Sequence, residues 1–247
     1  MTTPADLGPN FSSHRRDSRR GFAFPDLVVD VEASSLHDGY PIEIAIADIA
    51  AGRIHAWLIR PHASWAGDDW SPQSEKIHGL SKADIEAGED ASTVGKAMLD
   101  AAGGRKLASD NPEYDSWWIG RLFAAARADA RRKAPSFETT IRFHSKPIQE
   151  LLAARIRMSG RPAGGFEETN RFRKAFHEHS AAGDAASWAA ASELIRDPAS
   201  LSSARIRTVF ETWRERAAAA SPWRAKTRKL AETPEAGDPL RTPAGPP

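Results

Sequence analysis

The sequence contains no cysteine, so it forms no disulfide and offers no thiolate to a metal ion. Any metal that it binds must therefore be held by oxygen or imidazole ligands. It also lacks an apolar run near the ~18 residues that a membrane-spanning helix needs. Its first segment, MTTPADLGPNFSSHRRDSRR, is polar and basic and lacks the apolar core of a secretory signal. We therefore expect a cytoplasmic protein.

The sequence has almost no net charge, because 34 Lys and Arg residues offset 33 Asp and Glu residues. Global charge thus gives no sign of a nucleic-acid partner. Two local clusters are basic: residues 14–20 carry four arginines, and residues 224–229 carry four basic side chains. Such clusters attract phosphate without sequence specificity. Each is explained equally well as part of a solvated tail.

The composition, 40% hydrophobic and 27% charged over 247 residues, is typical of one globular α/β domain with small appendages. Residues 1–21 are polar and basic, and residues 231–247 are rich in Pro, Gly and Thr, so we predict disordered tails at both ends. Between them we expect a core domain over 22–198 and a helical extension over 199–230.

Three strands are predicted near the start of the core domain. Residues 26–33 form a short apolar run, and residues 41–48 and 53–60 alternate apolar and polar side chains. Their short connections predict an antiparallel meander. A helix-capping pattern follows at Ser81–Asp84. After it we predict helices over 93–102, from 113 and from 184, and strands over 105–109 and 139–143. We interpret 159–169 as a glycine-bearing loop and 202–219 as an amphipathic helix. This order predicts an α/β fold with a mixed sheet flanked by helices.

Two carboxylates lie within the first predicted strand. Asp30 and Glu32 are two residues apart, so their side chains point to the same face. Their neighbours Val28, Val29 and Val31 favour a buried strand, where carboxylates are costly unless they are paired or bind metal. The alternative is a strand end that reaches solvent. The pair therefore indicates a metal site without proving one.

Three further residues are explained singly by structural roles. Asp115 and Asp184 each lie near a predicted helix start, where an acid favours the helix dipole. His179 could be an ordinary exposed histidine. Because strand ends and helix starts converge at one edge of an α/β sheet, we expect all of these side chains to meet there. Gathered carboxylates without sulfur suit Mg²⁺ or Mn²⁺, and a histidine could accept a proton from water.

Three motifs, in order, resemble those of the DEDDh exonucleases, a 3′-to-5′ exonuclease family of the ribonuclease H-like superfamily. Residues 29–36 (VDVEASSL) are similar to the family's D-x-E-x-x-x-L, and residues 109–115 (SDNPEYD) to its N-x-x-x-D. Residues 179–185 (HSAAGDA) are similar to its H-x-x-x-x-D, and residues 77–81 (IHGLS) to its H-G-I/L-S loop. The resemblance covers about 26–196.

The resemblance implies a ribonuclease H-like sheet and hydrolysis of nucleic-acid 3′ ends with two Mg²⁺ or Mn²⁺ ions. It implies that Asp30 bridges the ions, that Glu32 and Asp184 complete one site, and that Asp115 serves the other. His179 would be the general base. The substrate contacts that it implies are Ala33, Ser34, Leu36, His78 and Asn111. Where the family often has threonines after the glutamate, this chain has Ala33, Ser34 and Ser35, which puts the sugar and base contacts in doubt.

Two alternatives to an active exonuclease remain. A non-catalytic nucleic-acid-binding module could keep the fold, but such loss usually removes an acid or the histidine, and all five are present. A structural protein whose acids merely cap helices would need the ordered motifs to be coincidental. The sequence leaves open the choice between RNA and DNA. Many family members form homodimers, but the sequence leaves the oligomeric state of this chain open.

Overall fold

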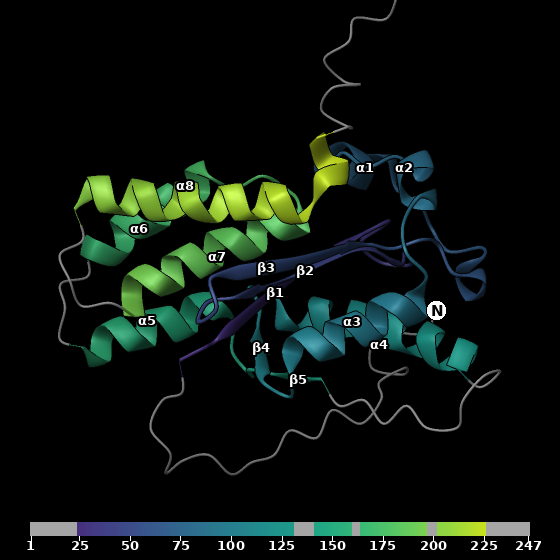
Figure 1. Cartoon of the computed structure of the whole chain (residues 1–247), viewed down its shortest axis with the longest axis horizontal. Helices are drawn as coiled ribbons and strands as arrows, with labels where there is room; N and C mark the ends of the chain where they lie inside the picture. Colours follow the sequence, from purple (N-terminus) through teal and green to yellow (C-terminus); the bar gives the residue numbers. More distant parts are fainter. Residues whose placement is uncertain (1–23, 131–140, 160–163, 197–201, 226–247) are drawn as a thin grey trace, which may run out of the picture.

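The computed structural model describes residues 24–130, 141–159, 164–196 and 202–225, and a mixed five-stranded sheet lies at its centre (Figure 1). The strand order is β3-β2-β1-β4-β5. β1, β2 and β3 form an antiparallel meander, whereas β4 is parallel to both β1 and β5. The predicted α/β class and the mixed sheet, with an antiparallel three-strand meander and parallel strands, are confirmed. The strands are β1 (Leu27–Ala33), β2 (Pro41–Asp48), β3 (Arg53–Leu58), β4 (Lys106–Ala108) and β5 (Arg142–Phe143).

Helices cover both faces of this sheet. No helix among the described residues is both long and apolar enough to cross a membrane. The helices, with one short 3₁₀ turn, are η2 (Ala63–Trp65), α1 (Pro72–His78), α2 (Lys82–Glu86), α3 (Ala91–Ala102), α4 (Pro112–Ala130), α5 (Ile148–Met158), α6 (Gly164–Ala175), α7 (Ala181–Arg196) and α8 (Ser203–Ala220).

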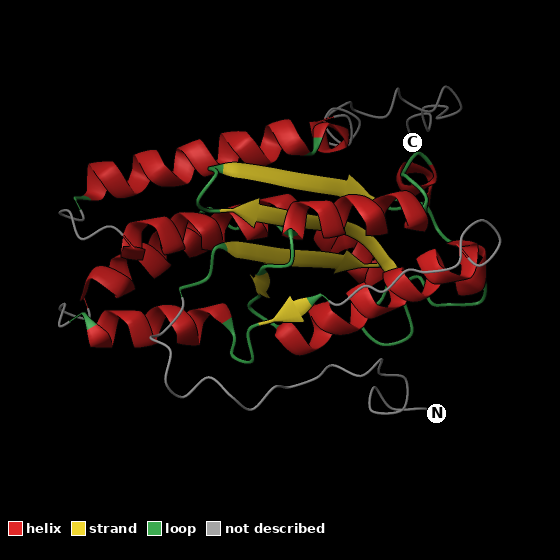
Figure 2. Ribbon diagram, turned by 60° about the horizontal axis from the view of Figure 1, so that its bottom comes forward, coloured by secondary structure: helices red, strands yellow, loops and turns green. Residues whose placement is uncertain are grey.

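The two faces of the sheet are covered by different groups of helices (Figures 1 and 2). Helices α5, α6, α7 and α8 lie on one face, with α7 against β1 and β2 and α8 against both α7 and β3. Helices α3 and α4 lie on the other face. The alternation of β1 divides its side chains between them: Val28 faces α7, and Val29 faces α3 and α4. We call these the α7 face and the α3–α4 face.

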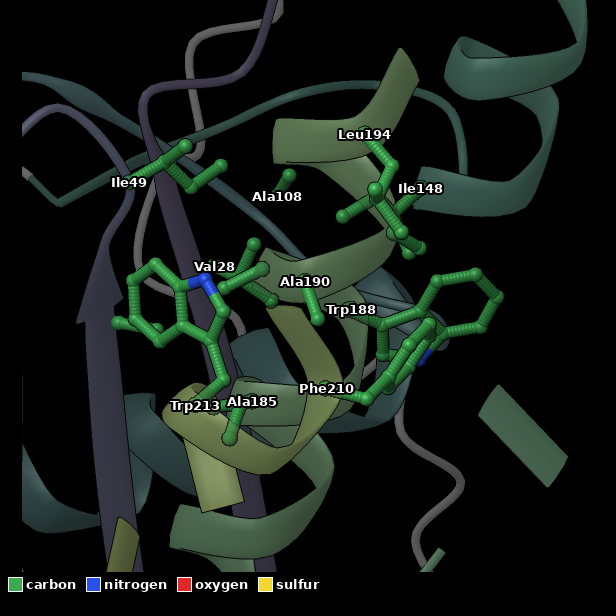
Figure 3. Packing of buried hydrophobic residues seen from close by; sticks show 14 of the residues in the cluster. Val28, Ile49, Ala108, Ile148, Ala185, Trp188, Ala190, Leu194, Phe210 and Trp213 are labelled. Carbon is green, nitrogen blue, oxygen red and sulfur yellow. The ribbon is translucent and has the colours of Figure 1, made fainter. Parts of the chain in front are cut away.

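Helix α7 is buried almost along its whole length, and its sequence AAGDAASWAAASELIR explains how. Alanine has the highest helix propensity and the smallest side chain that fits a helix interior without loss of stability. Small residues on both partners bring a helix close to the layer beneath it. Ala185 and Ala190 pack here with Val28 of β1 and with Phe210 and Trp213 of α8 (Figure 3).

Most predicted elements are confirmed, including the capping box in which Ser81 and Asp84 each bond the other's backbone N–H. The prediction of a loop over 159–169 is wrong from residue 164 onward, where α6 begins. Its opening glycines disfavour helix locally, but Phe172 stacks on Phe210 of α8, so tertiary packing decides. Helices α1 and α5 were not predicted. The two predicted tails lie outside the described residues.

Candidate active site

β1 carries two carboxylates on the α7 face at its carboxyl end. The side chains of Val28, Asp30 and Glu32 alternate with those of Val29 and Val31, so the same face that is apolar at Val28 becomes acidic two residues later. Val28 is fully buried, whereas Asp30 and Glu32 are half-buried. The acids therefore lie where the core meets solvent.

The start of α7 presents Asp184 to the same place. Ser180 caps the helix, since its Oγ accepts a hydrogen bond from the backbone N–H of Gly183 at 3.1 Å. A side chain on Gly183 would lie 2.7 Å from that Oγ, so the cap requires glycine. Asp184 follows in the first turn and is buried. The Gly-Asp order of the motif thus has a local physical reason.

Asp115 lies at the start of α4, the helix that follows β4, and β4 is the parallel neighbour of β1. Asp115 lies in the first turn of α4, directly after β4, and is 5% exposed. The buried Ser109 donates a hydrogen bond from its Oγ to the Asp115 carboxylate, and it accepts one from the backbone N–H of Asn111 at 2.9 Å. The turn between β4 and α4 therefore fixes the Asp115 side chain.

Asp30 belongs to two clusters of carboxylates. One consists of Asp30, Glu32 and Asp184, and the other of Asp30, Asp110 and Asp115. Within each, one ligand atom per residue lies within 4.8 Å of the others. The four acids singled out from the sequence are thus brought together, with Asp30 at the centre. Asp110 was missed, although its place between β4 and Asn111 was a signal that could have identified it.

Burial and repulsion from neighbouring carboxylates raise the pKa values of Asp30, Glu32 and Asp115. Burial is the main cause for Asp30, whose pKa lies well above its ordinary value, followed by the charges of Asp115 and Asp184. Burial, followed by the charge of Glu43, raises the pKa of Glu32 to about 8. Burial likewise raises that of Asp115, although its hydrogen bond from Ser109 opposes the shift. Crowded oxygen ligands of this kind suit hard divalent cations, which would relieve the repulsion.

Two histidines stand beside Asp184. His177 Nδ1 lies 2.5 Å from Asp184 Oδ1, and this contact is the main reason that the pKa of His177 is raised. The His179 ring lies edge-on to that of His177, with centroids 4.2 Å apart. His179 has a left-handed backbone, with φ 46°, which is uncommon outside glycine. His177, His179 and Asp184 also form a cluster with ligand atoms within 4.8 Å.

A pocket of about 270 Å³ opens over Asp30, Glu32, Asp110 and Asp115. Its walls combine the acids with apolar side chains, of which Leu36 is 58% and Ile77 50% exposed. Four of the predicted substrate contacts line it: Ala33, Leu36, His78 and Asn111.

Ser34 is not brought to this pocket. Its Oγ donates to the backbone carbonyl of Asp69 at 2.8 Å and accepts from the Tyr40 N–H at 2.9 Å. Its own N–H donates to the carbonyl of Tyr40 at 2.9 Å. These bonds close the loop after β1, so both the side chain and the backbone donor of Ser34 are already engaged. Ser35 lines the pocket in its place.

His78 is a neutral, buried group at the pocket wall. Burial and then the Arg224 charge lower its pKa to about 4. Its Nδ1 accepts a hydrogen bond from the Leu80 N–H at 3.1 Å, so Nε2 carries the ring proton. Nε2 has no hydrogen-bond partner within the described part of the chain. A buried donor without a partner is costly, which makes His78 a candidate contact to a ligand.

The sequence matches no protein-family model and no curated protein. Among solved structures, it aligns with the nuclease domain of 3′hExo, a DEDDh family member, bound to rAMP, at 14% identity and a TM-score of 0.42, covering 70% of this chain and 92% of that one. The chain is similar to the nuclease domain of a DEDDh family member. It also aligns with cell-death related nuclease 4 (CRN-4) at 11% identity and a TM-score of 0.37, covering 69% of this chain and 63% of that one. The chemistry of the site therefore follows from the positions of its own carboxylates and histidines.

Proposed function

We propose that this chain is a metal-dependent 3′-to-5′ exonuclease that hydrolyses phosphodiester bonds at nucleic-acid 3′ ends. One observation carries the proposal: Asp30 is shared by two carboxylate clusters, each with ligand atoms within 4.8 Å. A protein whose acids only cap helices has no reason to bring Asp115 and Asp184 to a common third carboxylate on a strand. The ordered motifs resembling the DEDDh family support the same reading.

The clusters fit two Mg²⁺ or Mn²⁺ ions. Asp30, Glu32 and Asp184 would hold one ion, and Asp30, Asp115 and Asp110 the other. A pair of such ions lowers the pKa of a bound water and stabilises the attacking and leaving oxygens of a phosphoryl displacement. Glu32 and Asp184 lie on the side nearer the histidines, so that side is where the water would lose its proton.

His179 is the proposed general base. A histidine titrates near neutral pH and can take a proton from water and release it to solvent. His179 is exposed beside Asp184, so its ring can turn toward a water held there. His177 contacts Asp184 directly and is the group to compare it with. In this proposal His177 orients Asp184, and His179 accepts the proton.

The pocket favours the unpaired end of a strand. Its volume, about 270 Å³, lies just below the range of ligand pockets and suits a terminal nucleotide better than a duplex. Leu36 and Ile77 offer apolar surface to a base, and the Nε2–H of His78 is a donor for a phosphate or sugar oxygen. RNA and DNA fit this description equally, because no contact in it is assigned to the 2′-hydroxyl that distinguishes the two sugars.

The test is digestion of matched, 5′-labelled single-stranded RNA and DNA in Mn²⁺, Mg²⁺ or EDTA. The expected result is a ladder that shortens from the 3′ end, requires metal, and names the preferred sugar. If the protein binds Mn²⁺ and both the RNA and the DNA but releases no nucleotide, the proposal of an enzyme would give way to that of a nucleic-acid-binding module. A chain that binds no divalent cation would overturn the metal assignment itself.

A matched pair of variants separates the histidines. Asparagine tolerates the left-handed backbone at position 179 better than alanine, so His179→Asn removes the base with little added strain. Loss of a general base costs roughly 10²–10⁴-fold in kcat. His177→Asn should cost less, since it removes only a contact to Asp184. The reverse order would assign the base to His177.

A further inference from the structure

Glu43 is a fully buried carboxylate next to the candidate metal site. It lies on β2 as the register partner of Glu32 on β1. Directly opposite residues of an antiparallel pair place their side chains on the same face, so Glu43 stands beside Glu32 on the α7 face. No metal cluster found in the described chain includes Glu43. A buried carboxylate persists only where charge and hydrogen bonds compensate it, so its partners reveal its role.

One partner is the start of α7. The backbone N–H of Ala181 donates to Glu43 Oε2 at 3.0 Å. The first N–H groups of a helix have no partner within the helix, and a carboxylate there also favours the helix dipole. Ala181 lies three residues before Asp184 and two after His179. Glu43 therefore fixes the end of α7 that carries one candidate ligand and follows the candidate base.

The other partners come from the segment after α8, residues 221–225. Trp223 Nε1 donates to Glu43 Oε1 at 2.8 Å, and Arg224 Nε donates to the same oxygen at 3.0 Å. Arg224 also donates to Oε2, so the guanidinium binds the carboxylate with two nitrogens. Such a paired geometry fixes orientation as well as charge.

The same guanidinium reaches the pocket wall. Arg224 donates a third hydrogen bond to the backbone carbonyl of His78, at the end of α1. The end of α8 lies beside α1 in Figure 1, consistent with this contact. Glu43 and Arg224 thus join four parts that are remote in sequence: β2 beside Glu32, the start of α7, the end of α1, and the segment after α8.

We infer that Arg224 and Glu43 are positioning residues of the proposed exonuclease, and that the segment after α8 completes its active site. This inference rests on the proposed function. The pair holds Asp184, Glu32 and His78 in one arrangement without touching substrate or metal. The positive charge of Arg224 offsets part of the negative charge that Glu43 brings beside Glu32. The pair is thus a second layer of contacts behind the metal ligands.

The test compares full-length variants that differ in structure but not in net local charge. Glu43→Met/Arg224→Met replaces the ion pair with apolar side chains, a change that often leaves stability unaltered or raises it. Loss of such supporting contacts typically costs about 10–100-fold in activity or metal affinity. We therefore expect kcat in Mn²⁺ to fall by about 10–100-fold while KM stays within roughly threefold. Arg224→Lys, which keeps the charge, should recover part of the loss.

Two milder variants guard against misfolding. Trp223→Phe keeps an aromatic ring but removes the indole N–H that donates to Glu43, and it should lower kcat by a few-fold. Arg207→Met makes the same substitution at an exposed position of α8 and should match wild type. If the double variant does not fold, wild-type kcat in both Trp223→Phe and Arg224→Lys would overturn the inference. A folded double variant with kcat within twofold of wild type would also overturn it.

Calorimetric titration with Mn²⁺ alone distinguishes this inference from the proposed function. Wild-type protein that binds Mn²⁺ but hydrolyses nothing would remove the proposed function only. The inference then stands if the double variant binds Mn²⁺ about tenfold or more weakly, and fails if the affinities agree. Wild-type protein that binds no Mn²⁺ would remove both.

Discussion

The two faces of the central sheet are packed by different means. On the α3–α4 face, β2 presents Ile42, Ile44 and Ile46 to large side chains such as Leu122 and Phe123. On the α7 face the same strand presents Glu43, Ala45 and Ala47, and the side chains of α7 that pack against this face are mostly alanines. One strand thus alternates between large and small residues.

This difference shows how a short side chain can reach a site. Helix–sheet spacing follows the size of the side chains between the two layers. The alanines of α7 keep that spacing small, so the carboxylate of Asp184 can approach that of Asp30 within 4.8 Å. The isoleucine-rich face packs large side chains directly against β2. We therefore expect the α3–α4 face to govern stability and the α7 face to govern activity.

The largest expected effect is on the α7 face, at the shared carboxylate. Asp30→Asn should reduce the proposed metal-dependent hydrolysis by roughly 10³-fold or more, because bound metal ions would contribute several kcal/mol to the transition state. The metal-free protein should melt at a higher temperature, since burial and neighbouring charges already raise the pKa of Asp30. Single-turnover kinetics and a thermal melt measure the two effects. Asp38→Asn, at an exposed position, is the control and should change neither.

The next effect tests the α3–α4 face. Ile44 is fully buried there, and Ile44→Ala should destabilise the protein by about 2–5 kcal/mol. At about 2–4 °C per kcal/mol for a chain of this size, the melting temperature should fall by about 4–20 °C. The kcat per folded molecule should stay within about twofold of wild type. A loss of kcat as large as that of Asp30→Asn would break the division between the faces.

Metal and pH act through the carboxylates gathered around Asp30. The pKa of Glu32 is about 8 in the folded chain and near 4.5 ordinarily, so between these values the folded state binds the extra proton. Metal-free stability should therefore fall as the pH rises from 5 to 8, and the raised pKa of His177 acts in the same direction. Mn²⁺ at a hundred times its Kd should restore about 2.7 kcal/mol. Melts at several pH values, with Mn²⁺ or EDTA, measure both; a metal-free melting temperature that rises with pH would contradict the crowding.

The smallest effect on stability is expected from enlarging one alanine of α7. Ala185 is fully buried next to Asp184, and Ala185→Leu should cost about 1–3 kcal/mol through overpacking. The kcat should fall by about 10–100-fold, because a displacement of a catalytic group by about 1 Å can lower the rate by about 10²-fold. Ala219→Leu, exposed on α8, is the matched control. If kcat survives in Ala185→Leu, close packing of α7 is not what places Asp184.

The sequence predicted what short-range patterns determine. The alternation in 41–48 gave β2 its bounds, and the spacing of Asp30 and Glu32 gave their common face. It did not predict what depends on distant partners. Arg224 and Glu43 are 181 residues apart, and nothing local to either indicates the other. Ser34 lies within the first motif, but its hydrogen bond with Tyr40 holds it in the turn after β1 and outside the pocket.

The place of Arg224 in the chain also has a consequence for when the site forms. Protein synthesis proceeds at about 5–20 residues per second, and Arg224 follows Asp184 by about forty residues, or roughly 2–8 s. The candidate metal ligands, the last of which is Asp184, are thus all synthesised before the residue that we infer to complete their arrangement. On our inference, the proposed activity would begin only once the segment after α8 has been synthesised and has packed against β2 and α1.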